Sequence, residues 1–229
     1  MKNITRKTEL FPKYSYLPCG ILVFMHFAVY YGTKPLQEGL KHYSPSLPID
    51  AMIPFRPEWS LIYALTFFFW VICAMVLMLQ ERETCFRMFA GLGIAEIICT
   101  VFFIAYPTVM VRPEIQGTAY GAKLLSQFYS SDIPVNLFPS MHCMISYILF
   151  RDLMYCKNVK KPYVIAAGLF TALVCSSTFF VKQHYVLDSI SGIILGEVCV
   201  WLSMRTSAWK AFDRLEKWLF KASAETVNT

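Results

Sequence analysis

The sequence predicts an all-α integral membrane protein, a single bundle of six transmembrane helices over residues 1–229. Hydrophobic residues make up 56% of the chain and charged residues only 16%, which is too apolar for an ordinary soluble domain. The apolar residues gather in six runs of about the 20 residues that a spanning helix needs. The basic residues lie between these runs and not on one face, so the net charge of +6 does not indicate nucleic acid.

The six expected spans follow the apolar runs in order. They cover residues 15–33, 59–79, 87–107, 140–157, 163–181 and 184–204. The sixth contains "GIILG", whose small residues four apart allow close helix packing. The eight cysteines form no CxxC pair and lie mostly inside the runs, so we interpret them as small core residues and not as a disulfide or metal framework.

Two connections between the spans contain features of their own. Within residues 108–139, "GTAYGAKLLSQFYSS" fits a short interfacial helix with Ala119, Leu124, Leu125 and Phe128 on one side, and fits an irregular loop equally well. The first connection, "HYSPSLPIDAMIPFRPEW", is rich in proline and aromatic residues. We expect it to cover the outer mouth of the bundle.

The distribution of basic residues predicts the orientation. The N-terminus, the second connection, the end of the fourth helix with the connection after it, and the C-terminal tail hold 15 of the 21 Lys and Arg. The positive-inside rule therefore places both termini in the cytoplasm. The fourth and sixth helices then both begin at the outer face, with "PSMH" and "QHYVLD". His142 and His184 are thus expected at the same membrane depth.

His184 and Asp188 form the first candidate catalytic pair. Residues four apart share one face of a helix. A carboxylate there can hold one imidazole nitrogen as N–H and leave the other free to attack an electrophile. Taken alone, the pair fits a structural helix cap as well. Ionisable groups near the membrane are costly, which favours the functional interpretation.

The stretch "FPSMH" supplies the second candidate group. Ser140 is a predicted N-cap, and the free N–H groups of the following turn favour an anion. His142 in that turn is either a general acid for a leaving oxygen or an ordinary interfacial histidine. Arg112 after the third helix and Lys182 before the sixth add two cations on the same side. The ligand that best fits this set is a phosphoryl group, with no metal or cofactor implied.

Several polar residues lie away from the outer mouth. We interpret them as buried structural pairs and not as a transport path: Glu96, Glu197, and Arg151 with Asp152. His26 is interpreted as a satisfied core histidine.

The stretches "VRP", "PSMH" and "STFFVKQHYVLD" resemble the three signature motifs of the type 2 phosphatidic acid phosphatase (PAP2) superfamily, over about residues 100 to 200. The resemblance implies a PAP2-like six-helix fold and a metal-independent reaction. It implies that His184 attacks phosphorus to form a phosphohistidine, that Asp188 orients it, and that His142 protonates the leaving group. Ser140 and Ser177 match motif positions next to the phosphate.

The sequence differs from the usual superfamily motifs at three positions. Ala105 stands where the first motif usually has Lys, Thr178 where the third has Arg, and Met141 where the second has Gly. Two phosphate-binding cations are therefore missing, and Lys182 is the candidate to replace one. "KQHYVLD" also resembles the inositol-phosphorylceramide and sphingomyelin synthase branch.

Three functions remain in play. The favoured one is a lipid phosphatase in a bacterial-type inner or plasma membrane, acting from the extracytoplasmic face on phosphatidic acid, phosphatidylglycerol phosphate or a polyprenyl pyrophosphate. The second is a lipid phosphotransferase with an alcohol acceptor. The third is a non-catalytic transporter or scaffold, which an intact His/His/Asp set disfavours. The lipid head group, the acceptor and the oligomeric state are left open.

Overall fold

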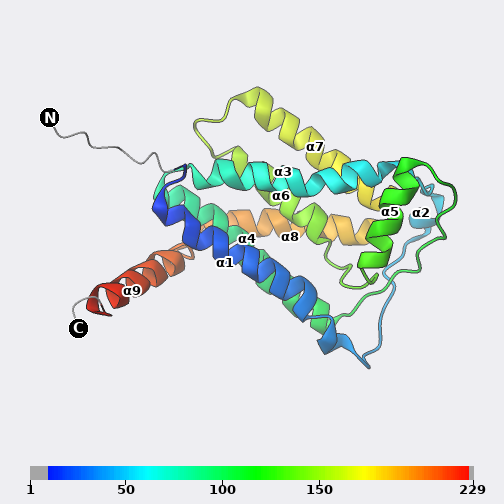
Figure 1. Ribbon diagram of the computed structural model, residues 1–229, viewed down its shortest axis with the longest axis horizontal. Helices are drawn as coiled ribbons and strands as arrows, with labels where there is room; N and C mark the ends of the chain where they lie inside the picture. The colour runs from blue at the N-terminus through cyan, green and yellow to red at the C-terminus, as the bar shows by residue number, and fades with distance from the viewer. Residues whose placement is uncertain (1–9, 227–229) are drawn as a thin grey trace.

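The chain folds into a bundle of helices (Figure 1). The structure is a computed structural model that describes the backbone of residues 10–226 and the side chains of residues 10–219. In this part of the chain the regular elements are helices, and β-pairing is confined to two isolated bridges. The predicted all-α class is therefore confirmed. Five described segments are long and apolar enough to cross a membrane: Lys13–Gln37, Pro57–Met78, Arg82–Ala105, Lys161–Phe180 and Val186–Arg205.

These segments contain the five long helices: α1 (Lys13–Gly32), α3 (Ser60–Met78), α4 (Arg82–Ala105), α7 (Lys161–Phe180) and α8 (Val186–Arg205). The other helical elements are η1 (Pro35–Gln37), α2 (Pro48–Met52), η2 (Pro57–Trp59), α5 (Tyr120–Ser131), α6 (Met141–Leu153) and α9 (Lys210–Thr226). The start of α1 and the whole of α9 lie at one end of the bundle, and α2 and α5 lie at the other (Figure 1). The connection over residues 108–139 therefore contains a helix, α5, and not only an irregular loop. Ala119 is the exposed N-cap residue of α5 and not part of its packed side.

The fourth predicted span differs from its expectation. In place of residues 140–157 the structure has α6, with 13 residues and hence a length of about 20 Å, against a hydrocarbon core of about 30 Å. Nine of its residues are buried, and it packs against α3, α4, α7 and α8. Because protein surrounds α6, it does not need the long apolar surface of a lipid-facing helix.

The "GIILG" stretch lies at the contact between α8 and α6. A Cβ atom on Gly192 would stand 2.5 Å from the carbonyl oxygen of Ser140, and one on Gly196 would stand 3.1 Å from the ring of Tyr147. Only glycine permits this approach, so the predicted small-residue face is confirmed as a helix contact. It holds the helix that carries His142 against the helix that begins just after His184.

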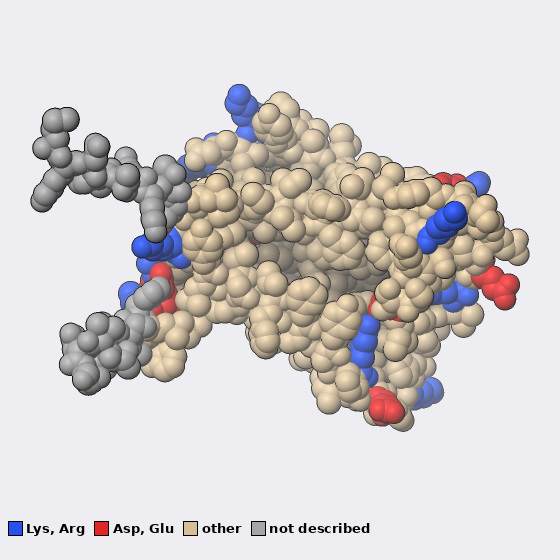
Figure 2. Space-filling model, in the orientation of Figure 1, with Lys and Arg blue, Asp and Glu red and all other residues tan. Residues whose placement is uncertain are grey.

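The surface agrees with an integral membrane protein. In Figure 2 the Lys, Arg, Asp and Glu side chains gather toward the two ends of the molecule, and uncharged atoms cover the face between them. Large apolar side chains on the long helices face outward, such as Phe24 on α1, Phe68 on α3 and Trp201 on α8. An uncharged belt with outward aromatic residues is what a lipid environment selects.

The polar residues away from the predicted site differ in how they are paired. Arg151 is in a pair, as expected, but its partner is Glu197 on α8, with N–O distances of 2.7 and 2.9 Å, and the pair is partly exposed and not buried. Asp152 is buried, and neither of its carboxylate oxygens has a hydrogen-bond partner among the described residues. His26 on α1 is bonded to Glu96 on α4, with 3.0 Å between Nδ1 and Oε1.

Candidate functional site

The two predicted histidines lie next to each other at the end of the bundle where α6 and α8 begin. The centroids of the His142 and His184 rings are 5.6 Å apart. The backbone N–H of Ser140 donates to the carbonyl of Asp188 at 2.9 Å, which ties the two helix starts together. The sequence prediction that both histidines share one level of the bundle is therefore confirmed.

His142 is positioned by the cap of its helix and by stacking. The Ser140 hydroxyl accepts the N–H of Cys143 at 3.3 Å, which is the predicted N-cap bond. The ring of His142 stacks on Tyr63 from α3, with 4.6 Å between centroids. Its Nε2 atom is buried and has no hydrogen-bond partner among the described residues. This nitrogen is available to exchange a proton with a ligand.

His184 is held through its Nδ1 atom. The carbonyl oxygen of Leu137 lies 3.1 Å from Nδ1, and the nearer carboxylate oxygen of Asp188 lies 3.6 Å away. The same carboxylate oxygen accepts the N–H of Tyr185 at 2.8 Å and so caps α8. Two acceptors thus favour a proton on Nδ1 and leave Nε2 unprotonated, with Leu137 sharing the orienting role that was predicted for Asp188 alone.

A cavity of about 630 Å³ at the α2 end of the bundle, called the outer cavity for its place at the end of the molecule, reaches His184 together with both predicted cations, Arg112 and Lys182. The connection between α1 and α3 covers it, as expected. The Lys182 ammonium donates to the carbonyls of Ile53 at 2.7 Å and Asp50 at 3.1 Å. Burial lowers the pKa of Lys182, and the Asp50 carboxylate partly opposes this.

Arg112 is almost enclosed, with 8% of its side chain exposed. It donates to the carbonyl of Asp132 at 2.6 Å and to the side-chain oxygen of Gln183 at 2.5 Å. Its guanidinium also lies over the ring of Tyr129. The cation is thus fixed in one orientation beside the residue that precedes His184.

The Asp132 carboxylate connects α1, the segment just after α1 and the segment after α4. The sequence analysis did not predict this connection. Its carboxylate accepts from Tyr30 at 2.6 Å and from Lys34 at 2.8 Å, and lies 3.6 Å from Arg112. A carboxylate between two cations occupies the kind of position that a phosphate favours. Lys34 was visible in the sequence only as one of the six outer basic residues, and Gln183 only as the neighbour of Lys182.

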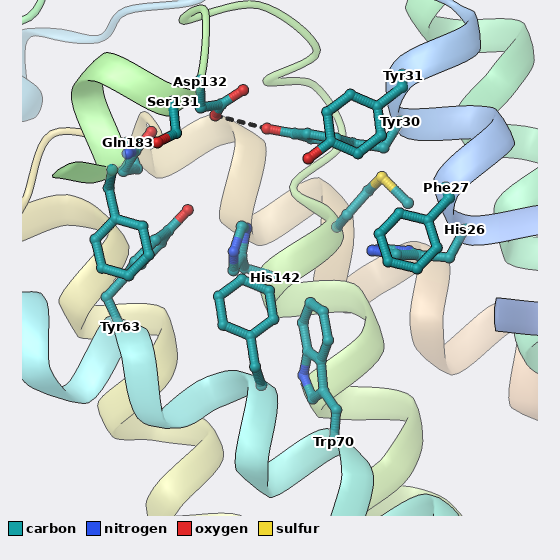
Figure 3. Close-up of a pocket in the computed structure, with 13 residues that line it drawn as sticks. His26, Phe27, Tyr30, Tyr31, Tyr63, Trp70, Ser131, Asp132, His142 and Gln183 are labelled. Carbon is teal, nitrogen blue, oxygen red and sulfur yellow. Dashed lines mark hydrogen bonds between the residues drawn. The ribbon is translucent and has the colours of Figure 1, made fainter. Parts of the chain in front are cut away.

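A second cavity, of about 230 Å³, opens beside His142 on the other side. Figure 3 shows His142 in its centre, facing His26 across the space, with the rings of Tyr63, Trp70 and Phe27 around them. Asp132 and Gln183 close its outer end. His142 therefore faces a largely aromatic chamber and His184 faces the polar outer cavity, and both rings also line a small third cavity that shares residues with each of the two.

Three predicted site residues, Ser140, Ser177 and Asp188, line neither of these two cavities. Ser177 is the one with no hydrogen bond or ion pair to the other site residues in the described part of the chain. It is fully buried in α7 and donates to the carbonyl of Val174. Ser140 is likewise buried and contributes its cap. The amides of Met141 and His142 lack a protein acceptor among the described residues. These amides are free to bind an anion at the start of α6.

In the described part of the chain no group of three or more His, Cys, Asp or Glu is arranged to hold a metal ion. Comparisons with protein-family models, with curated proteins and with solved structures find no match.

Proposed function

We propose that the chain is a membrane lipid phosphatase of the PAP2 superfamily, which hydrolyses a lipid phosphate monoester or pyrophosphate through a phosphohistidine. The observation that carries the proposal is the pairing of His142 and His184, 5.6 Å apart, with Nδ1 of His184 already facing two acceptors. A nucleophile and a general acid at this spacing can flank one phosphoryl group. Arg112 and Lys182 line the cavity that reaches His184.

In the first step of the proposed reaction, the lone pair on Nε2 of His184 attacks phosphorus. The bond between phosphorus and the lipid oxygen breaks, and Nε2 of His142 gives its proton to that oxygen. The lipid leaves as an alcohol or, from a pyrophosphate, as a monophosphate. Asp188 stabilises the positive charge that develops on the His184 ring, because its carboxylate lies 3.6 Å from Nδ1.

In the second step, His142 is unprotonated and serves as the base. It takes a proton from water, whose oxygen attacks phosphorus as the bond to His184 breaks. Inorganic phosphate leaves, and both histidines return to their starting states. Arg112 and the free amides at the start of α6 stabilise the negative charge on the phosphoryl oxygens in both steps.

Phosphate release by the purified protein across a panel of lipid phosphates tests the proposal, with His184→Ala as the matched inactive variant. Loss of the nucleophile should lower turnover by several orders of magnitude. It should also abolish an acid-labile phosphoenzyme in rapidly quenched samples. Near-wild-type turnover by His184→Ala would refute the mechanism. His42→Ala controls for loss of any histidine, because His42 is a half-buried histidine of the first connection whose ring contacts the carbonyl of Leu40 and neither cavity.

A lipid phosphotransferase is the second candidate. The aromatic chamber beside His142 favours it, because an alcohol dissolved in the membrane can enter an apolar chamber more easily than bulk water can. The same two steps apply, with the alcohol oxygen in place of water. Addition of long-chain alcohols or diacylglycerol to the assay separates the two, since a transferase forms a new phospholipid in place of free phosphate.

We propose further that α6 is the fourth of six spans, that both termini are cytoplasmic, and that the site opens on the extracytoplasmic face of a bacterial-type inner or plasma membrane. The 15-to-6 division of basic residues supports this orientation. The start of α1 and α9 lie at the end of the bundle opposite α5 (Figure 1), as an even number of crossings requires.

A further inference from the structure

A groove between α1 and α3 leads away from His142 toward the middle of the bundle. The aromatic chamber beside His142 and a lower cavity of about 320 Å³ share His26, Phe27, Phe67 and Trp70 in their walls. The two therefore adjoin each other at these side chains, and Figure 2 shows the surface hollowed between these helices. Apolar side chains make up most of the lower wall, among them Leu22, Val23, Val71, Phe89, Leu92 and Ile145.

The groove has a polar end at His142 and one polar pair farther along, His26 with Glu96. Nδ1 of His26 lies 3.0 Å from Oε1 of Glu96, and the two side chains are 26% and 4% exposed. The other carboxylate oxygen of Glu96 is buried without a partner, and Nε2 of His26 makes no hydrogen bond within residues 10–219. Figure 3 shows the His26 ring pointing from α1 into the chamber.

The chemistry of this pair determines what it can bind. In an apolar setting an uncompensated charge is costly, so the pair is favoured as imidazolium with carboxylate or as imidazole with carboxylic acid. In both forms a proton lies between Nδ1 and Oε1, and Nε2 carries the second hydrogen. His26 therefore presents an N–H donor to the groove, and the complementary group on a ligand is an acceptor such as a carbonyl oxygen.

We infer that the groove binds a diacyl lipid phosphate and that Nε2–H of His26 donates to one of its acyl carbonyls. The inference rests on the proposed function, because it places the phosphate of the same lipid between His142 and His184. Ring centroids put Trp70 5.5 Å from His142 and 5.8 Å from His26. The Trp70 ring thus lies next to both histidine rings, so the glycerol segment of the lipid would lie against Trp70 and the acyl chain would continue along the lower wall.

This assignment selects among substrates. Phosphatidic acid and phosphatidylglycerol phosphate have acyl carbonyls near the phosphate, whereas a polyprenyl pyrophosphate has none. The chain should therefore act on diacyl phosphates in preference to polyprenyl ones. The cleanest probe pair is diacyl phosphatidic acid and the dialkyl ether lipid of the same chain length, which differ only in the two carbonyl oxygens.

The test measures kcat/KM for phosphate release from both lipids. One hydrogen bond to a charged group is worth roughly a tenfold preference for the diacyl lipid. His26→Phe should reduce the ratio to about one, and His42→Phe should preserve it. Because the ratio compares two substrates on one variant, a partly unfolded sample does not alter it.

Two results would overturn the inference: equal kcat/KM values for the wild-type protein, or an unchanged ratio in His26→Phe. If the wild-type protein releases no phosphate from any lipid, the proposed function fails. Binding of the same two lipids, measured by native mass spectrometry, then tests whether the groove recognises the acyl carbonyls. A tenfold binding preference that His26→Phe removes supports the carbonyl site without the enzyme activity. Equal binding refutes it.

Discussion

Substitution of Gly192 by alanine tests whether the contact between α6 and α8 sets the geometry of the site. The added Cβ would lie 2.5 Å from the carbonyl oxygen of Ser140, where ordinary contact begins at 3.4 Å. The atoms on both sides belong to helix backbones, so the helices must separate by the difference, about 0.9 Å. Overpacking of this kind costs about 1–3 kcal/mol of folding free energy. A displacement of about 1 Å between reacting groups can cost roughly 10²-fold in rate.

Two measurements on Gly192→Ala follow from this geometry. We expect a lower unfolding temperature in detergent and a fall of about 10²-fold in the rate constant of phosphate release, because Ser140 begins the helix that carries His142. Gly20→Ala is the matched control, since a Cβ there meets nothing within 4 Å. If Gly192→Ala behaves like Gly20→Ala in both measurements, the α6–α8 contact does not set the spacing of the histidines.

Four further substitutions probe the site and its orientation. Arg112→Ala should lower kcat/KM at least about tenfold through loss of a charge-assisted contact. Lys182→Gln should cost less, because Nζ already donates to two loop carbonyls; losses of equal size in kinetic assays would contradict this. Asp188→Asn should fold and lose less than the roughly 10⁴-fold expected for a wrong tautomer, because Leu137 also faces Nδ1. A cysteine at exposed Lys123, in a background without reactive cysteines, should react with an impermeant reagent from outside. Labelling only after lysis would contradict the proposed orientation.

The level of the two histidines could be predicted because alternation of helix direction fixes it. Once six apolar runs are counted, the fourth and sixth must begin at the same end, whatever the details of packing. The i,i+4 spacing of His184 and Asp188 is equally local. The structure adds that the carboxylate also caps α8 through the N–H of Tyr185, so the capping and catalytic interpretations of Asp188 are not exclusive.

Other features could not be predicted because they depend on contacts across the chain. Asp132 meets Tyr30 and Lys34, about a hundred residues earlier, and no local pattern indicates that. The length of α6 depends on its being enclosed by four other helices, which a hydropathy window does not measure. His26 was expected to be a satisfied core histidine, but it is half-buried, with Nδ1 bonded to Glu96 and no hydrogen bond at Nε2 within the described residues; Glu96 was considered separately.

The charge balance of the site follows from these long-range contacts. In the motifs that the sequence resembles, cations are expected at the positions of Ala105 and Thr178, and Lys182 was the expected replacement. Its ammonium instead holds the covering loop through the carbonyls of Asp50 and Ile53. Lys34, brought from the end of α1 by Asp132, is a cation that the sequence motifs do not include. Because the Asp132 carboxylate faces both Lys34 and Arg112, the phosphate of the proposed substrate would meet two cations that are already oriented toward an anion.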